Sequence, residues 1–179
     1  TLGDQGDAYM DVFEALLTRR SIRKYTSQPV PQEWILDILK AAMYAPSANN
    51  QQPWRFIVIR ERQTLDAITA YHPYAQMLKE APLAIAVCAD RRNLKSEPYW
   101  IQDCSAATQN LLLAAHAKGL GSVWIGIYPR PERVEKTIDL LGLPEGVTPL
   151  CFVALGFPAE EVPQPQRFDL GKIHYEKWS

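Results

Sequence analysis

The sequence predicts an α+β or α/β domain in which one layer of β-sheet is covered by helices. Segments with helical spacing of apolar residues alternate with short β-rich runs, and one such run, residues 83–89, is apolar throughout. A strand that is apolar on both faces needs cover on both faces, so we expect the sheet to lie between helices. At 179 residues, 47% of them hydrophobic, the chain is long enough for one domain with its own core.

The first half of the chain predicts three helices and one strand. Apolar residues at helical spacing indicate helices over residues 12–17 and 31–45, and Pro31 suits the first turn of the second. The run WRFIVI, residues 54–59, is rich in β-branched and aromatic residues and predicts a strand. A further helical segment is expected near residues 61–70.

The second half predicts three strands and two helices. The strand at 83–89 precedes the longest expected helix, residues 99–118, which Gly119 ends as a C-cap would. Strands are expected over residues 122–128 and 147–155, separated by a helix within residues 130–143. We find no internal repeat and no interdomain linker.

From Gly156 onward the periodic pattern ends in a proline-rich segment. This segment still carries Phe168, Ile173, Tyr175 and Trp178, and so much apolar surface would be poorly placed in water. We expect it to lie on the body of the domain or on a second subunit, with disorder as the alternative. Residues 1–10 are expected to be flexible.

Composition excludes several classes of function. The net charge of −1 gives no general attraction to nucleic acid or to an anionic membrane, and no apolar run is long enough to cross a bilayer. The three cysteines, Cys88, Cys104 and Cys151, form neither a disulfide framework nor a CxxC motif. The three histidines are equally scattered, so no metal site is expected, and a reducing cytoplasm fits best.

Residues 19–25, RRSIRKY, place four cations and a serine directly after the first predicted helix. Cations near a helix C-terminus complement the helix dipole by about 0.3–1 kcal/mol each, which would explain the cations alone. Ser21 favours a second interpretation, because a hydroxyl beside guanidinium groups can hold a phosphate through several charge-assisted hydrogen bonds. Both interpretations are open at this point.

Two later segments suit the contact surface of a ligand. Residues 45–56, APSANNQQPWRF, gather amide donors and acceptors at a helix end, which suits the edge of a flat heteroaromatic molecule, although a polar loop would look the same. Residues 117–129, AKGLGSVWIGIYP, place glycines where a ligand can approach the backbone closely. The glycines do not match a dinucleotide fingerprint or a P-loop.

The order of these three motifs, followed by VPQPQRF at residues 162–168, resembles the nitroreductase family of FMN-dependent oxidoreductases, in its short single-domain members. The resemblance extends from about Asp11 to Trp178. It implies an α+β fold, a three-layer α/β/α sandwich with a mixed sheet, as one domain over residues 1–179. It also implies that the C-terminal arm, residues 157–179, packs on the partner subunit of a homodimer.

The resemblance assigns the cofactor contacts by position. The matching residues are Arg19, Arg20, Ser21, Arg23, Pro46, Ser47, Ala48, Asn50, Trp124, Ile125, Gly126, Ile127 and Arg167. Arg19, Ser21 and Arg167 would hold the FMN phosphate, although Gln164 and Gln166 stand where many relatives carry a second basic residue. Arg23 would lie beside the pyrimidine edge, where a cation favours the charge of the reduced flavin and raises its potential.

The remaining contacts place the flavin between two subunits. Residues 46–50 would reach it from the other subunit, and a backbone amide within residues 124–127 would point at N5, the atom that accepts hydride. The implied reaction passes hydride from NADH or NADPH through the flavin to a nitroaromatic, a quinone or a similar acceptor, with ping-pong kinetics. No catalytic side chain is assigned.

Other activities on the same scaffold stay open. Reductive dehalogenation, azoline oxidation and flavin fragmentation would use the same FMN contacts, and a non-catalytic flavin-binding protein would use them too. The alternative flavin chemistries would differ in the lid above the flavin, which we expect at residues 71–78 and 91–100, whereas a protein without turnover would stay yellow with NADH and NADPH. Since the flavin carries the chemistry, we interpret Cys88 and Cys151, which lie in predicted strands, as core residues.

Overall fold

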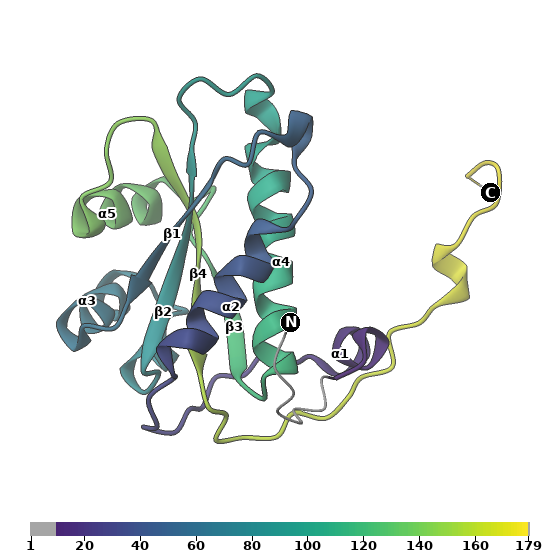
Figure 1. Cartoon of the computed structure of the whole chain (residues 1–179), viewed down its shortest axis with the longest axis horizontal. Helices are drawn as coiled ribbons and strands as arrows, with labels where there is room; N and C mark the ends of the chain where they lie inside the picture. Colours follow the sequence, from purple (N-terminus) through teal and green to yellow (C-terminus); the bar gives the residue numbers. More distant parts are fainter. Residues whose placement is uncertain (1–9, 179) are drawn as a thin grey trace, which may run out of the picture.

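The computed structural model, which describes residues 10–178, has a four-stranded sheet between two layers of helices (Figure 1). The strands are β1 (Trp54–Ile59), β2 (Leu83–Asp90), β3 (Gly121–Gly126) and β4 (Val147–Gly156), in the order β1-β2-β4-β3. The α-helices are α1 (Val12–Thr18), α2 (Gln32–Met43), α3 (Arg62–Tyr71), α4 (Trp100–Ala117) and α5 (Pro131–Leu141). The flexibility expected for residues 1–10 lies, except at Met10, outside the described residues.

Every helix and strand expected from the sequence is present, with ends that differ by a few residues. Pro31 is the N-cap of α2 rather than a residue of its first turn. Gly119 adopts φ +76° directly after α4 and donates its N–H to the carbonyl of His116. A residue with a Cβ would be strained in that conformation, so the glycine helps to end the helix there.

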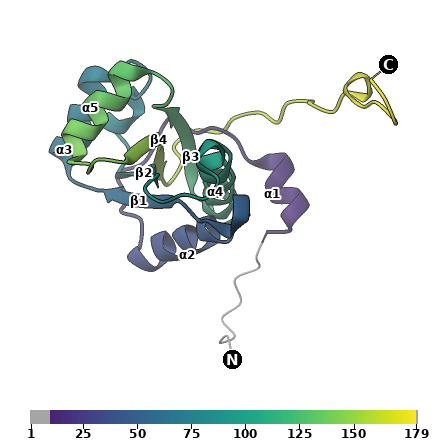
Figure 2. The same cartoon turned by 90° about the horizontal axis from the view of Figure 1, so that it is seen from above.

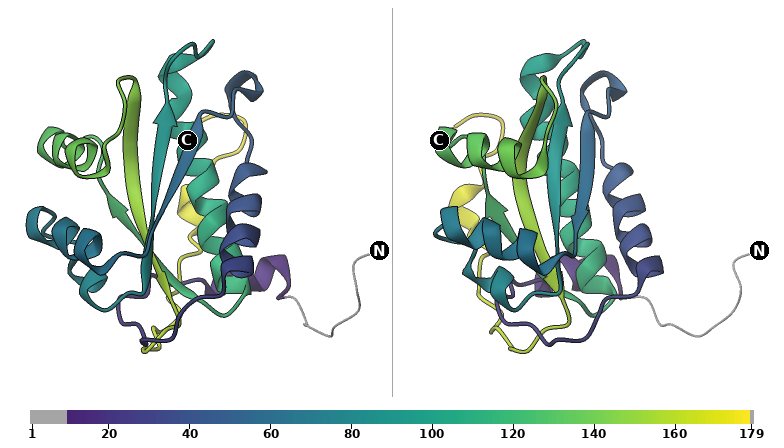
Figure 3. Two further views of the ribbon diagram at one scale, coloured as in Figure 1. Left: turned by 60° about the vertical axis from the view of Figure 1, so that its left-hand side comes forward. Right: turned by 90° about the vertical axis from the view of Figure 1, so that its left-hand side faces the viewer.

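The central strand β2 is buried on both faces, as its apolar run predicts. Leu83, Ile85 and Val87 belong to the core formed with α2 and α4, whereas Ala84 and Ala86 belong to the core formed with α3. This alternation follows from the two-residue period of a strand. Figure 3 shows the resulting layers, with α2 and α4 on one face of the sheet and α3 and α5 on the other.

The sheet differs from the expected mixed sheet in one respect. The pairs β1–β2, β2–β4 and β3–β4 are all antiparallel. Among the described residues the parallel component is a single bridge between Ser21 and Ser122. The residues around Ser21 follow the edge of β3 only briefly, too briefly to add a fifth strand. The expected fold class, α+β with helices on both faces, is confirmed.

Two apolar segments lie outside the body of the domain. Helix α1 buries Ala15, while Phe13 and Leu17 are 70% and 61% exposed. The C-terminal arm leaves the sheet after Phe157 and extends away from the body (Figure 2), with Phe168 and Trp178 80% and 89% exposed. The start of the arm lies on its own domain, where the N–H of Ala159 donates to the carbonyl of Lys24. The large apolar side chains from Phe168 onward are exposed.

The cysteines are core residues, as predicted for Cys88 and Cys151. All three are free and buried, and burial raises the pKa of the Cys88 and Cys104 thiols to about 12. Such thiols stay protonated near neutral pH and are poor nucleophiles. Within residues 10–178, no helix combines the length and the apolar character that a crossing of the bilayer requires.

The layered core makes a stability prediction. Ile85 is fully buried between the sheet and the helices α2 and α4. Ile85→Ala should lower the free energy of unfolding by about 2–5 kcal/mol, because it leaves a cavity that rigid neighbours cannot fill. Val58→Ala, on an edge strand with Val58 36% exposed, should lower it by about 1 kcal/mol or less. Urea unfolding measures both, and equal losses would contradict the burial assigned to β2.

Candidate functional site

A cavity of about 470 Å³ opens beside the outer edge of β3, and we call it the β3 pocket. Its lining comes from the RRSIRKY motif, the segment after α3, strand β3 and helix α5. The lining residues are Arg23, His72, Pro73, Tyr74, Gln76, Met77, Val123, Trp124, Ile125, Gly126 and Arg133. They include two arginines and no carboxylate, so the pocket favours an electron-rich or anionic ligand.

The backbone of β3 presents polar groups to this pocket. The N–H of Ile127 donates to the carbonyl of Leu150 at 3.1 Å, so the peptide groups of residue 127 face β4. Along an antiparallel strand, successive N–H groups point alternately toward the neighbouring strand and away from it. The N–H groups of Trp124 and Gly126 therefore point away from β4. A Cβ placed on Gly126 would have no heavy atom within 4 Å. A flat molecule can therefore lie close to this backbone.

The RRSIRKY motif lies against the start of β3. The N–H of Ile22 donates to the carbonyl of Ser122 at 3.0 Å, and the Glu160 carboxylate accepts from the N–H of Arg23 at 2.6 Å. A Cβ on Gly121 would lie 2.7 Å from Cγ2 of Ile22, so only glycine allows this approach. From Ser21 onward the motif is thus an extended segment held from both sides. Its first two cations lie at the end of α1, where Arg19 is the C-cap and the Arg20 guanidinium donates to the carbonyl of Leu17.

Successive side chains of this segment point to opposite sides. Arg23 lines the β3 pocket, whereas Thr18, Arg20 and Ile22 line a separate cavity of about 390 Å³ that also contains His116. The guanidinium of Arg20 donates to the carbonyls of Arg19 and Leu17. The structure therefore turns Arg20 away from the pocket that Arg23 enters, although the sequence analysis grouped the two.

The structure brings the late arginine Arg167 to the N-terminal motif. The pKa of Arg19 is lowered by burial and by the nearby charges of Arg167 and Arg20. Among the described residues, no carboxylate forms an ion pair with Arg19 or Arg167. Positive charge that is half-buried and uncompensated attracts an anion, and a phosphate accepts several charge-assisted hydrogen bonds from such a group.

Residues 46–50 lie at the other end of α2 from the motif (Figure 1). Asn49 and Asn50 both adopt φ 51°, a strained value for residues other than glycine. Asp103, only 4% exposed, fixes this turn by accepting from the N–H of Ala48 at 2.8 Å and from Nε2 of Gln51 at 2.7 Å. One chain therefore does not bring residues 46–50 to its own β3 pocket.

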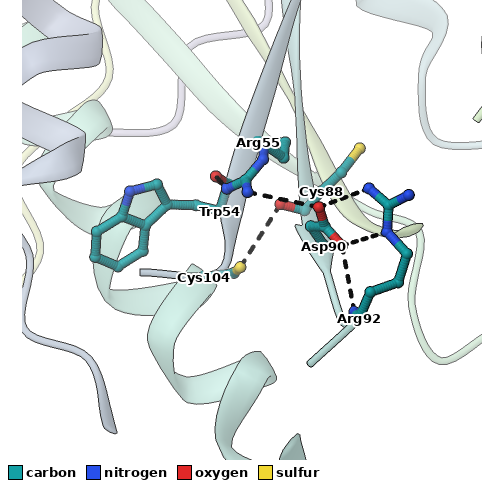
Figure 4. Close-up of polar contacts among 6 residues, drawn as sticks. All are labelled: Trp54, Arg55, Cys88, Asp90, Arg92 and Cys104. Carbon is teal, nitrogen blue, oxygen red and sulfur yellow. Dashed lines mark hydrogen bonds and ion pairs between the residues drawn. The ribbon is translucent and has the colours of Figure 1, made fainter. Parts of the chain in front are cut away.

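The cavity beside that turn is polar, and the carboxylate in its lining, Asp90, is paired with two arginines. Asp90 at the end of β2 lies between Arg55 and Arg92, at 3.5 Å and 2.8 Å (Figure 4). The hydrogen bond from Arg92 is the largest of the effects that lower the pKa of the Asp90 carboxyl to about 2. Paired charge of this kind contrasts with the uncompensated charge around Arg19.

The two expected lid segments are separated by the structure. Residues 72–77 line the β3 pocket, as a lid would, while residues 92–95 line the polar cavity beside Asp90. The sequence did not indicate Arg133 or Asp103 as site residues, and it indicated His72 only as part of the expected lid segment 71–78. An acid within the apolar pattern of α4 could have indicated Asp103, but His72 and Arg133 come together only in the fold.

In the part of the chain from residue 10 to residue 178, no group of His, Cys, Asp and Glu side chains could hold a metal ion.

Comparison with known proteins gives a consistent result. The family model described as "Nitroreductase family" matches residues 16–72 and 67–157. A relative from Methanothermobacter thermautotrophicus, provisionally named NADH dehydrogenase/NAD(P)H nitroreductase, is 52% identical over 94% of this chain and 88% of its own length.

Two solved structures extend the comparison. A protein of Bacteroides thetaiotaomicron with the same provisional name is 40% identical with a TM-score of 0.89, over 97% of this chain and 100% of that one. A protein of Desulfovibrio desulfuricans, provisionally called a nitroreductase and solved in complex with FMN, is 35% identical with a TM-score of 0.81, over 94% and 98%.

The close contact between the motif and β3 is testable. Gly121→Ala would push a methyl group into Ile22 and should lower the free energy of unfolding by about 1–3 kcal/mol. Gly126→Ala is the matched control, since its methyl group meets open space, and it should change the value by about 0.5 kcal/mol or less. Urea unfolding measures both variants. A Gly121→Ala protein as stable as its control would show that the motif does not touch β3.

Proposed function

The chain belongs to the nitroreductase family, and on this premise we propose that it carries electrons from NAD(P)H through bound FMN to a small oxidised acceptor, such as a nitroaromatic or a quinone. It is an FMN-dependent oxidoreductase, in keeping with its relatives' names and with the FMN complex of the Desulfovibrio desulfuricans protein. The observation that carries the proposal is the open backbone of β3 at Gly126 with the cation of Arg23 beside it.

Residues at the two ends of the motif suit the two ends of FMN. Arg19 and Arg167 supply uncompensated positive charge for the phosphate, and the Ser21 hydroxyl, on the same side of the segment as Arg23, would add a hydrogen bond. The β3 pocket would receive the ring system over residues 124–127. Arg20 faces the other cavity, so we leave it out of the proposed contact set.

Bound FMN would supply the redox chemistry, which is hydride transfer from NAD(P)H to the acceptor in two half-reactions. The chain binds and orients the reactants. Arg23 places a fixed cation in the pocket, which favours a ligand that gains negative charge. Residues 72–77 cover the pocket and, with Tyr74 71% exposed, would present an aromatic surface to the acceptor.

We further propose that the protein acts as a homodimer. Residues 46–50 lie far from the β3 pocket of their own chain, so they could reach a flavin only from a partner subunit. The apolar side chains of α1 and the large apolar side chains of the arm from Phe168 onward are also exposed in one chain. Burial of these surfaces between two copies would remove a large apolar area from water.

The FMN proposal predicts a specific loss at Gly126. The purified protein should bind FMN, turn yellow, and lose that colour anaerobically on addition of NADH or NADPH. Gly126→Ala should weaken FMN binding by about tenfold or more, because its methyl group occupies the space of the ring, while stability is unchanged. Fluorescence titration measures the affinity. A wild-type chain that binds no FMN would overturn the proposal.

The dimer proposal predicts the effect of removing the arm. A chain ending at Val162 keeps Ala159 and Glu160, which bond to the motif, but loses the exposed apolar arm. It should elute as a monomer in size-exclusion chromatography and bind FMN weakly. Arg167→Gln is the control, since it should weaken FMN binding about tenfold by losing one charged contact and still elute as a dimer. A truncated chain that stays dimeric would contradict the role of the arm.

A further inference from the structure

His72, which follows α3, is buried beside the β3 pocket with 1% exposure. Its Nε2 lies 2.8 Å from the carbonyl oxygen of Gly126, and its Nδ1 accepts the N–H of Tyr74 at 3.2 Å. Since Nδ1 is an acceptor, the ring proton is on Nε2, which donates to Gly126. Both contacts are satisfied only when the imidazole is neutral and in this tautomer.

Arg133 of α5 joins the same two elements. Its Nη1 donates to the Gly126 carbonyl at 3.2 Å, and its guanidinium lies 5.4 Å from the centre of the Tyr74 ring. The Gly126 carbonyl therefore receives two donors, and Tyr74 is held by two contacts. His72 and Arg133 together tie the floor of the pocket, at Gly126, to its cover, at Tyr74.

We propose that His72 is a positioning residue of the flavin site, whose neutral ring fixes the end of β3 and the 72–77 segment in the arrangement that receives the flavin. The inference rests on the proposed function of the β3 pocket. His72 acts through the backbone of Gly126 and Tyr74 and transfers no proton in the reaction. The redox chemistry is unchanged by its presence, but the shape of the site depends on it.

Protonation would break this arrangement. A proton on Nδ1 would face the N–H of Tyr74. The hydrogen bond between these two groups would be lost, and two donors would point at each other. The charge that acts on the ring is that of Arg133 from α5, while Tyr71 of α3 is uncharged and bonded to Thr137. Arg23 of the motif lines the same pocket. The positive charge of Arg133 disfavours an imidazolium.

The pKa of His72 moves in the matching direction. Burial lowers it, the Gly126 carbonyl raises it, and Arg133 lowers it, with a net lowering from the ordinary value of about 6.5. The folded state thus favours the neutral ring. Stability from this site is present above about pH 6.5 and is lost as the pH falls towards the lowered pKa.

The first experiment reads the ring directly in the flavin-free protein. Nitrogen-15 NMR of the histidine side chains at pH 7.5 should show one ring with its proton on Nε2 and a hydrogen-bonded, unprotonated Nδ1. This signal should disappear in His72→Gln. A His72 ring protonated on Nδ1, or titrating like a free imidazole, would overturn the inference whatever the chain binds.

The second experiment compares FMN affinity in three proteins at pH 7.5 and at a pH below the His72 pKa, as found by the NMR titration. His72→Gln keeps a donor for the Gly126 carbonyl but cannot titrate, and His72→Asn is too short to reach that carbonyl. On going from the higher to the lower pH, the Kd for FMN should rise about five- to tenfold more in the wild type than in His72→Gln. This extra factor is the effect expected from the loss of one hydrogen bond. His72→Asn should bind more weakly by a similar factor at both pH values.

The FMN phosphate and the other histidines are common to all three proteins, so their titration changes the three Kd values alike. A difference between the proteins therefore reports on residue 72. Equal pH dependence in the wild type and His72→Gln, or unchanged affinity in His72→Asn, would overturn the positioning role and leave the proposed function intact. A wild type that binds no FMN at either pH would overturn the proposed function and the positioning role together. Urea unfolding at pH 7.5 verifies that both variants are folded.

Discussion

Strand β3 is the edge strand beside β4, so the peptide groups on its outer side must find partners that no further strand supplies. The chain meets this requirement in different ways along one edge. Ile22 pairs with Ser122 at the start of the strand, and His72 and Arg133 donate to Gly126 at its end. Between these points the outward N–H groups face a cavity. The motif, the pocket and its cover are thus arranged around one incompletely paired edge.

The helices and strands could be predicted from the sequence because their apolar residues either cover both faces of a strand or recur at helical spacing. Strand β2 is apolar at every position of its core, and α4 repeats its apolar residues over many turns, so local pattern and tertiary environment agree. The pattern of α1 predicted its helix equally well. It did not reveal that the apolar side faces away from the domain, since periodicity reports a face and not what covers it.

The site was predictable as a set of segments and less so as a set of side chains. The motif RRSIRKY indicated an anion site, but the separation of Arg20 from Arg23 depends on the extended conformation that Gly121 permits. His72 gave no signal, because its partners lie on β3 and on its own loop. Asp103 holds the strained turn at Asn49 from a distant helix. Such contacts arise from long-range packing, which a local pattern does not contain.

The two-faced burial of β2 has a consequence during synthesis. Ile85 pairs with Val153 across the centre of the sheet, so β2 gains this neighbour only when most of the chain has left the ribosome. Until then an apolar strand has one partner, β1, and an open edge that other nascent chains could join. Pairing over so long a sequence separation is also slow. Chaperone protection of the growing chain would be most valuable in the interval between the emergence of β2 and that of β4.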